Sequence, residues 1–236
     1  MARMARVQLA GVPQHIMQRG NNRQAAFFCD NDYAVYLDKL REYAGKYHVS
    51  IHAFVLMTNH VHLLLTPSSD MGASQMMQSL GRYYVRYINQ TYKRSGTLWE
   101  GRYKSSLVDD EGYFMAVSRY IELNPVRADM VRRPEDYRWS SYAHNGGDAD
   151  IKLITPHGIY ETLGEDKAAR RKAYGDLVCE LVSPEAEDEI NLCMRKGWAL
   201  GSDKFKAGVE KMAGRRVTPK PRGGDRKSKK YQINLL

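Results

Sequence analysis

The chain has 236 residues, 43% of them apolar, so it can bury the core of one large domain or of a medium domain with a smaller addition. Its formal net charge of +9 favours a polyanionic partner. The three cysteines cannot all pair within one chain and form no Cys-x-x-Cys motif, which argues against a disulfide framework or a zinc knuckle.

The first third of the chain predicts a strand, a helix and two further strands. Residues 12–19 read as a strand that ends at a Gly-Asn-Asn turn. Apolar side chains at helical spacing follow over residues 33–47, with acidic and amide residues before them as caps. Residues 52–57 and 60–65 then predict two strands that are antiparallel across a short turn.

The next part of the chain completes a sheet. Residues 73–92 predict a strong amphipathic helix, and residues 104–108 predict a fourth strand. Acidic residues 109–111 then start a helix, whose regular part should end near Pro125. The order β-α-β-β-α-β followed by a helix predicts an α+β fold with a ferredoxin-like, split β-α-β sheet. Strands one and three should be central, with the two crossover helices on one face and the last helix on the other.

The chain changes character after the Gly-Gly pair at residues 146–147. We expect a domain over residues 1–147, a helical region over 148–213 and a basic, flexible tail over 214–236. Residues 214–231 hold eight Lys/Arg and one Asp, a charge of +7, which leaves +2 on the rest (9 − 7). Such a tail is typical of disordered ends, and it can also order on phosphate.

The triplet His60-Val61-His62 opens the third predicted strand. Side chains alternate between the faces of a strand, so His60 and His62 point the same way. Two imidazoles two residues apart can hold one divalent metal ion. Taken alone, the triplet is more typical of a half-exposed strand with two ordinary histidines.

A tyrosine and an amide lie four residues apart in the predicted last helix. Tyr120 and Asn124 therefore share one face of it. A pair of histidines that can bind a metal ion on the sheet, with a tyrosine on the covering helix, suggests a nuclease whose nucleophile is a phenol. Tyrosine attack on a phosphodiester would give a phosphotyrosine and a free hydroxyl, and the retained bond energy allows rejoining without ATP. Tyr113 is a weaker candidate on the same helix, because it lacks the spacing to an amide.

Four motifs in order make the chain resemble the REP-associated tyrosine transposases, which are relatives of single-tyrosine HUH transposases. They are FVLMTNHVHLL (54–64), LWEGRYKS (98–105), RYIELNPVRA (119–128) and YRWSSY (137–142). The resemblance covers roughly residues 10–145. It implies an HUH-type sheet, His60, His62 and Asn124 as ligands of Mg²⁺ or Mn²⁺, and Tyr120 as the nucleophile. Asn124 stands where related transposases use the longer glutamine.

The resemblance also implies a substrate and a location. Family substrates are single-stranded DNA palindromes that fold as hairpins, cut through a 5′-phosphotyrosine. The chain lacks the apolar core of a signal peptide and the roughly 18 apolar residues of a membrane span. We therefore expect a cytoplasmic bacterial protein that is nucleoid-associated when bound to DNA, without membrane contact. Both a monomer and a homodimer fit, because one nucleophile per chain can act in pairs or sequentially.

Basic and aromatic side chains between residues 82 and 104 form the predicted DNA-binding surface, with a solvated helix face as the competing interpretation for each cation. Trp99 could stack on bases, although buried tryptophans are more common. Two other functions remain: a non-catalytic hairpin DNA- or RNA-binding protein on the same fold, and a plasmid-type relaxase or replication initiator. The predicted DNA-binding residues are Arg82, Arg86, Lys93, Arg94, Trp99, Arg102 and Lys104.

Overall fold

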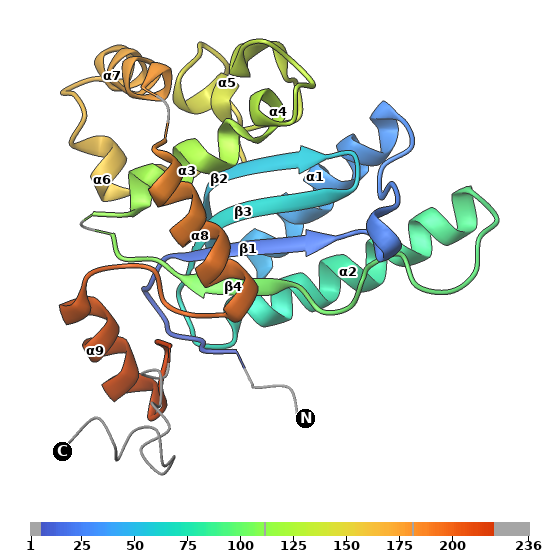
Figure 1. The fold of residues 1–236 in the computed structure, drawn as a ribbon. Coiled ribbons are helices and arrows are strands. Elements are labelled where there is room, and N and C mark those ends of the chain that lie inside the picture. Colours follow the sequence, from blue (N-terminus) through green and yellow to red (C-terminus); the bar gives the residue numbers. More distant parts are fainter. Residues whose placement is uncertain (1–5, 111, 181, 220–236) are drawn as a thin grey trace, which may run out of the picture.

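A four-stranded antiparallel sheet organises the computed structural model, which describes residues 6–110, 112–180 and 182–219 (Figure 1). Its strands are β1 (Gln14–Arg19), β2 (Val49–Met57), β3 (His60–Pro67) and β4 (Lys104–Leu107). They are ordered β2-β3-β1-β4, so β1 and β3 are central. The predicted α+β, ferredoxin-like fold is confirmed, with β2 starting three residues earlier than its apolar run suggested.

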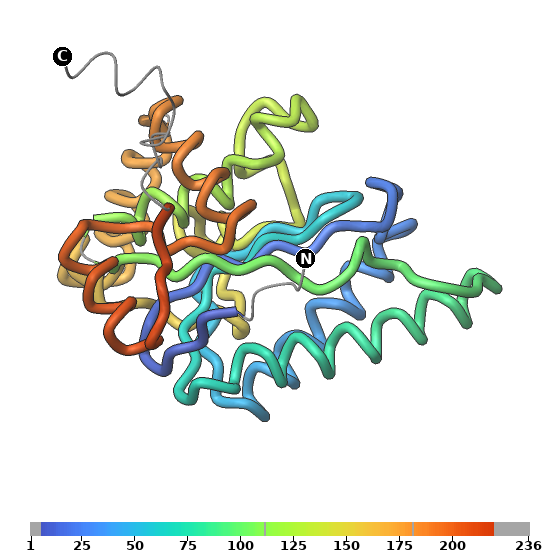
Figure 2. The backbone as a smooth tube through the Cα atoms, turned by 60° about the horizontal axis from the view of Figure 1, so that its bottom comes forward, coloured from blue at the N-terminus to red at the C-terminus, as the bar shows by residue number. Residues whose placement is uncertain are grey.

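Two long helices cover one face of the sheet. They are α1 (Asp30–Lys46) and α2 (Gly72–Thr91), which lie side by side beneath the strands in Figure 2. Their apolar stripes bury Leu40 and Leu80 against strand residues that include Leu63. This core uses alternate residues of β3, so the other alternate set, beginning with His60, faces the opposite layer.

The opposite face is covered by α3 (Phe114–Glu122) and α8 (Pro184–Lys196), which both lie in front of the strands in Figure 1. The predicted helix start at residues 109–111 was wrong, since α3 begins at Phe114. Asp109 instead accepts hydrogen bonds from the backbone N–H (2.9 Å) and hydroxyl (2.8 Å) of Ser202. Asp109 therefore connects the segment after β4 to the C-terminal helices and does not start a helix.

The chain stays helical beyond the predicted stop. After Leu123 a short helix, α4 (Asn124–Arg127), carries Pro125 in its first turn, where proline is tolerated because no intrahelical N–H bond is lost. The remaining elements are short connections and helices. They are η1 (Asn21–Arg23), η2 (Pro134–Asp136), α5 (Tyr142–Asn145), α6 (Gly158–Glu161), α7 (Lys167–Cys179) and α9 (Asp203–Ala213).

A buried carboxyl joins the helical C-terminal region to α3. Glu122 accepts hydrogen bonds from Ser141, from Asn145 (2.8 Å) and from Tyr174 on α7 (2.7 Å). Tyr174 also contacts the hydroxyl of Ser118 (2.9 Å). Burial raises the pKa of Glu122 to about 7. The network fixes the helix that carries Tyr120 to two later segments of the chain.

The start of the basic segment packs against the body of the protein. Val217 is buried, and its carbonyl accepts a 3.0 Å hydrogen bond from the backbone of Ala199. The rest of the predicted tail, 220–236, lies outside the described residues. Within the described ranges, no helix combines the length and apolar character needed to cross a membrane.

Candidate active site

His60 and His62 lie on the face of β3 that α3 covers. Their ring centroids are 5.1 Å apart and nearly perpendicular. His60 Nδ1 lies 2.6 Å from Asn59 Oδ1, and the Asn59 amide nitrogen donates to the carbonyl of Arg23, which fixes the amide orientation. Because Oδ1 only accepts, His60 carries its proton on Nδ1 and leaves Nε2 with a free lone pair.

A third histidine, which sequence reasoning missed, completes the cluster. His15 on β1 is buried, and its Nε2 lies 2.8 Å from Nδ1 of His62. The only sequence signal was a histidine within the first predicted strand. The strand register sets His15 opposite Leu64 and places Met17 opposite His62, so His15 and His62 meet diagonally on one face.

Burial keeps the three imidazoles neutral. Desolvation lowers the pKa of His15 to about 3 and that of His60 to about 4, and it holds the pKa of His62 well below its usual value. The neighbouring charges of Arg19 and Arg127 lower the His62 value further. Neutral imidazole is the form that ligates a metal. When the Nδ1–H of His62 donates to Nε2 of His15, the Nε2 atom of His62 keeps a free lone pair.

Tyr120 lies directly over this cluster. Its ring centroid is 6.0 Å from that of His62 and 5.8 Å from that of His15. The guanidinium carbon of Arg127 stands 4.1 Å from the centroid of the Tyr120 ring, a cation–π contact. The helix thus brings a phenol and a cation to the two histidines.

Helix α8 closes the site from outside. The Tyr120 hydroxyl donates a 2.9 Å hydrogen bond to Asn191 Oδ1, and Arg127 pairs with Glu187 at 3.2 Å. The Tyr120 side chain is consequently only 4% exposed. Neither Asn191 nor Glu187 was among the predicted site residues, because both lie more than sixty residues away in the helical region.

Asn124 is close to the tyrosine in the way the spacing predicted. It is 8% exposed, and its Nδ2 donates to the carbonyl of Tyr120 at 3.3 Å, which leaves Oδ1 as an available acceptor. The described residues contain no group of three or more His, Cys, Asp or Glu side chains arranged to hold a metal. The candidate donors on this side of the sheet are the His60 and His62 imidazoles and the Asn124 amide oxygen.

A family model described as "Transposase IS200 like" matches residues 9–124, a segment that contains every residue of this cluster except Arg127 and the α8 contacts. Residues 9–124 therefore form a domain of the IS200-like transposase type. The resemblance inferred from the motifs is thereby confirmed, and the family implies an enzyme that acts on DNA.

One solved structure shares this fold. A REP-associated tyrosine transposase bound to a REP hairpin matches with a TM-score of 0.55 and 16% identity, over 66% of this chain and 99% of that one. A candidate transposase from Deinococcus radiodurans R1 matches with a TM-score of 0.36 and 20% identity, over 51% of this chain and 96% of that one. No curated protein matches the chain.

Four of the predicted DNA-binding residues surround one groove. Arg82 and Arg86 of α2 line it with Trp99 and Arg102 from the segment before β4, around a volume of about 800 Å³. The same walls also carry glutamine side chains, which can donate and accept hydrogen bonds with base edges. They are Gln18, Gln75 and Gln78.

Three predicted residues do not line this groove, and Trp99, which does, is largely buried. Lys93 and Arg94 follow α2 and are absent from the groove walls, and Arg94 stands 5.5 Å over the ring of Phe28. Trp99 is 5% exposed and stacks on Tyr84, with centroids 6.0 Å apart. Trp99 therefore offers no exposed platform for bases, because its ring belongs to the core beneath α2, as the more common of the two interpretations had it. Lys104 lies on β4, away from this groove.

Proposed function

We propose that this chain cleaves and rejoins single-stranded, hairpin-forming DNA through a 5′-phosphotyrosine at Tyr120. The observation that carries the proposal is the position of the Tyr120 ring above His62, on the sheet face that His60 shares. Nucleophile and candidate metal ligands thus converge from a helix and a strand that are nearly sixty residues apart in sequence. Such convergence is the geometric requirement for covalent phosphoryl chemistry.

The reaction exchanges one phosphodiester for another. The Tyr120 oxygen forms a bond to phosphorus as the bond from phosphorus to the 3′ oxygen breaks. The phenol proton is lost and the departing 3′ oxygen gains one, so the products are a 5′-phosphotyrosine and a 3′-hydroxyl. Attack by a 3′-hydroxyl reverses these steps and joins two strands.

The candidate ligands are His60 Nε2, His62 Nε2 and Asn124 Oδ1, and the ions we propose are Mg²⁺ and Mn²⁺. When bound, such an ion would offset the charge of a non-bridging phosphate oxygen and orient the group. Asn59 and His15 hold the two imidazole rings in place, and His15 sets the tautomer of His62. Arg127 supplies a positive charge beside the phenol, where phosphate charge has to be accommodated.

We propose that the groove along α2 recognises the hairpin. Arg82, Arg86 and Arg102 supply cations for phosphates, and the glutamines of the same walls supply donors and acceptors for base edges. The structural relative with this fold is described as bound to a REP hairpin, which supports hairpin DNA as the substrate class.

The test is cleavage of synthetic hairpin oligonucleotides with single-stranded flanks, in Mn²⁺ or Mg²⁺ and in chelator. We expect cleaved strands only with metal and only with intact His60 and His62, so His60→Ala and His62→Ala abolish cleavage while hairpin binding survives. Asn124→Ala should weaken metal use. Cleavage in chelator would reject the metal role. Tight hairpin binding without cleavage in any metal would establish the alternative, a non-catalytic binding protein.

A further inference from the structure

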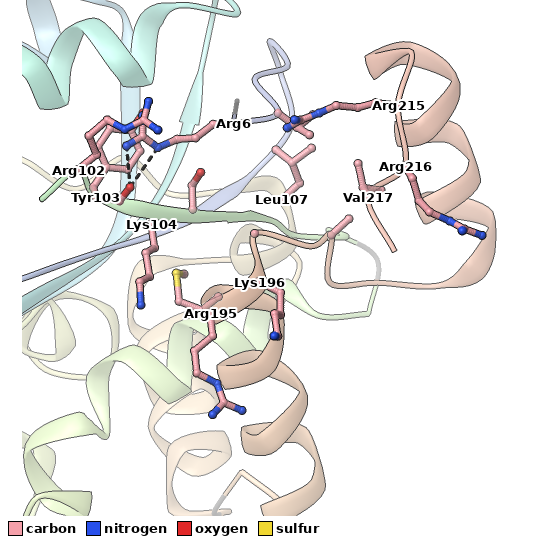
Figure 3. Close-up of a pocket in the computed structure, with 15 residues that line it drawn as sticks. Arg6, Arg102, Tyr103, Lys104, Leu107, Arg195, Lys196, Arg215, Arg216 and Val217 are labelled. Atoms are coloured by element: carbon pink, nitrogen blue, oxygen red, sulfur yellow. Dashed lines mark hydrogen bonds between the residues drawn. The ribbon is translucent and has the colours of Figure 1, made fainter. Parts of the chain in front are cut away.

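A cationic cavity of about 290 Å³ lies between the edge strand β4 and the C-terminal helices (Figure 3). Figure 3 shows basic side chains from β4, from the end of α8 and from the segment after α9 around it. None of the residues that line it is acidic. The cations, besides Arg6, are Arg102, Lys104, Arg195, Lys196, Arg215 and Arg216.

These cations have few acidic neighbours, of which Glu210 beside Arg216 is one. Within the described part of the chain, none of the six cations just named forms a salt bridge, although twelve such bridges occur elsewhere. Like charges gathered around a low-dielectric hollow repel one another, and an anionic ligand relieves that repulsion. The cavity is therefore suited to a polyanion.

The cavity has walls held by backbone pairing rather than by loose side chains. The N–H of Leu200 donates to the carbonyl of Leu107 at 2.8 Å, and the N–H of Ala199 donates to that of Val217 at 3.0 Å. Ser106 on β4 donates to the carbonyl of Trp198 at 2.6 Å. The C-terminal segments thus cover the free edge of β4 and fix the backbone that carries their cations.

The strand register places Lys104, which lines the cavity, two strands away from His62 in the candidate active site. Lys104 pairs with Met17, and Met17 pairs with His62, so the three residues lie side by side on the α3 face. Neighbouring strands lie about 4.8 Å apart, which places Lys104 about 10 Å from His62 along the backbone. Lys104 also lines a small hollow of about 110 Å³ with Met17 and Arg19.

We propose that this cavity binds the phosphodiester backbone of the single strand that leaves the active site, next to the hairpin. This inference rests on the proposed function and adds a separate binding site to it. The strand would run from the histidines past Met17 and Lys104 to Arg195 and Lys196. Arginine forks suit phosphate oxygens, and backbone contacts require no particular base. The groove along α2 would hold the hairpin itself.

The test measures binding in chelator, so it does not depend on cleavage and stays informative if the nuclease proposal fails. The probes are a hairpin alone, the same hairpin with a single-stranded flank on either side, and flanked hairpins whose flank phosphates are methylphosphonates. The variant is Arg195→Gln with Lys196→Gln. Its matched control is Lys204→Gln with Lys211→Gln, two exposed lysines of α9 that do not line the cavity.

A flank should tighten binding to the parent protein, and methylphosphonates should cancel that gain. The Arg195/Lys196 variant should lose most of the gain and bind the bare hairpin as the parent does. Its salt dependence for the flanked probe should flatten by about 1.4, since each lost single-strand phosphate contact removes about 0.7 from the slope. The proposal would be overturned if the Arg195/Lys196 variant lost the same affinity for the bare and the flanked hairpin, or if the control variant lost as much as it did. It would also be overturned if the parent protein bound the methylphosphonate flank as tightly as the natural one.

Discussion

The hydroxyl of Tyr120 donates a 2.9 Å hydrogen bond to Asn191 Oδ1, which joins the candidate nucleophile to a helix outside the matched family segment. The adjacent Arg127–Glu187 pair makes a second link between the same two parts of the chain. DNA that reaches Tyr120 must displace this helix or at least break the Asn191 bond. The covering helix α8 is therefore expected to slow attack.

Asn191→Ala should raise the single-turnover cleavage rate. A neutral hydrogen bond contributes about 1 kcal/mol net, so its loss should speed cleavage about fivefold if the bond has to break first. Leu192→Ala, at an exposed neighbour on α8, is the matched control and should leave the rate unchanged. A rate for Asn191→Ala equal to or below that of the parent would show that Asn191 does not restrain Tyr120.

His15 should control metal affinity without touching the metal. In the arrangement that exposes the Nε2 lone pair of His62, its Nδ1–H donates to His15. Removing such an outer partner typically lowers metal affinity 10- to 100-fold. We expect this loss for His15→Ala, measured as Mn²⁺ binding by electron paramagnetic resonance, and a smaller loss for His15→Gln. Unchanged affinity in a folded His15→Ala protein would remove His15 from the site.

Glu122 should make stability depend on pH. Its pKa is raised to about 7 in the folded state from 4.5, so folding retains a proton that the unfolded chain releases between these values. The resulting stabilisation is fully present below pH 4.5 and is lost as pH rises through 7, by up to about 3 kcal/mol.

Glu122→Gln mimics the neutral carboxyl and cancels this dependence. The free energy of unfolding of the parent, relative to Glu122→Gln, should fall steeply between pH 5 and 7 and level off at about pH 8. Urea unfolding of both proteins at each pH measures the difference, in which the opposing contributions of the histidines cancel. Parallel stability curves would contradict the protonated Glu122 network.

The distal part of the basic segment should add affinity without specificity. Truncation after Pro219 removes six Lys/Arg and one Asp, a charge of +5 (6 − 1), and leaves Arg215 and Arg216 in place. We expect a flatter salt dependence of DNA binding and an unchanged preference for a hairpin over a scrambled strand. If truncation abolished the preference for the hairpin but left the total affinity unchanged, the distal segment would be the part that recognises the hairpin. Truncation after Gly214 should additionally weaken binding to single-stranded flanks.

Local periodicity made much of the fold predictable. Alternation placed His60 and His62 on one strand face, and the spacing of four placed Asn124 beside Tyr120, because both patterns depend only on backbone geometry. His15 was missed because its role depends on the register between β1 and β3. Asn191 was missed for a similar reason, since the packing of α8 over the sheet is a tertiary contact that no local pattern encodes.

Long-range contacts also decided questions that the local pattern left open. Trp99 could have stacked on bases or been buried, and its ring fills the space beneath α2 beside Tyr84. The acids at 109–111 have the pattern of a helix start, yet Asp109 is used to hold Ser202. In both cases a long-range contact decided the outcome.

The most direct test is to map the covalent adduct. The parent protein, incubated with Mn²⁺ and a flanked hairpin, should form a DNA-linked species that peptide mass spectrometry places on Tyr120. Tyr120→Phe removes only the hydroxyl, so it should bind the hairpin like the parent and form no adduct, while Tyr113→Phe should form it normally. An adduct that persists in Tyr120→Phe, mapped to another residue, would contradict the account.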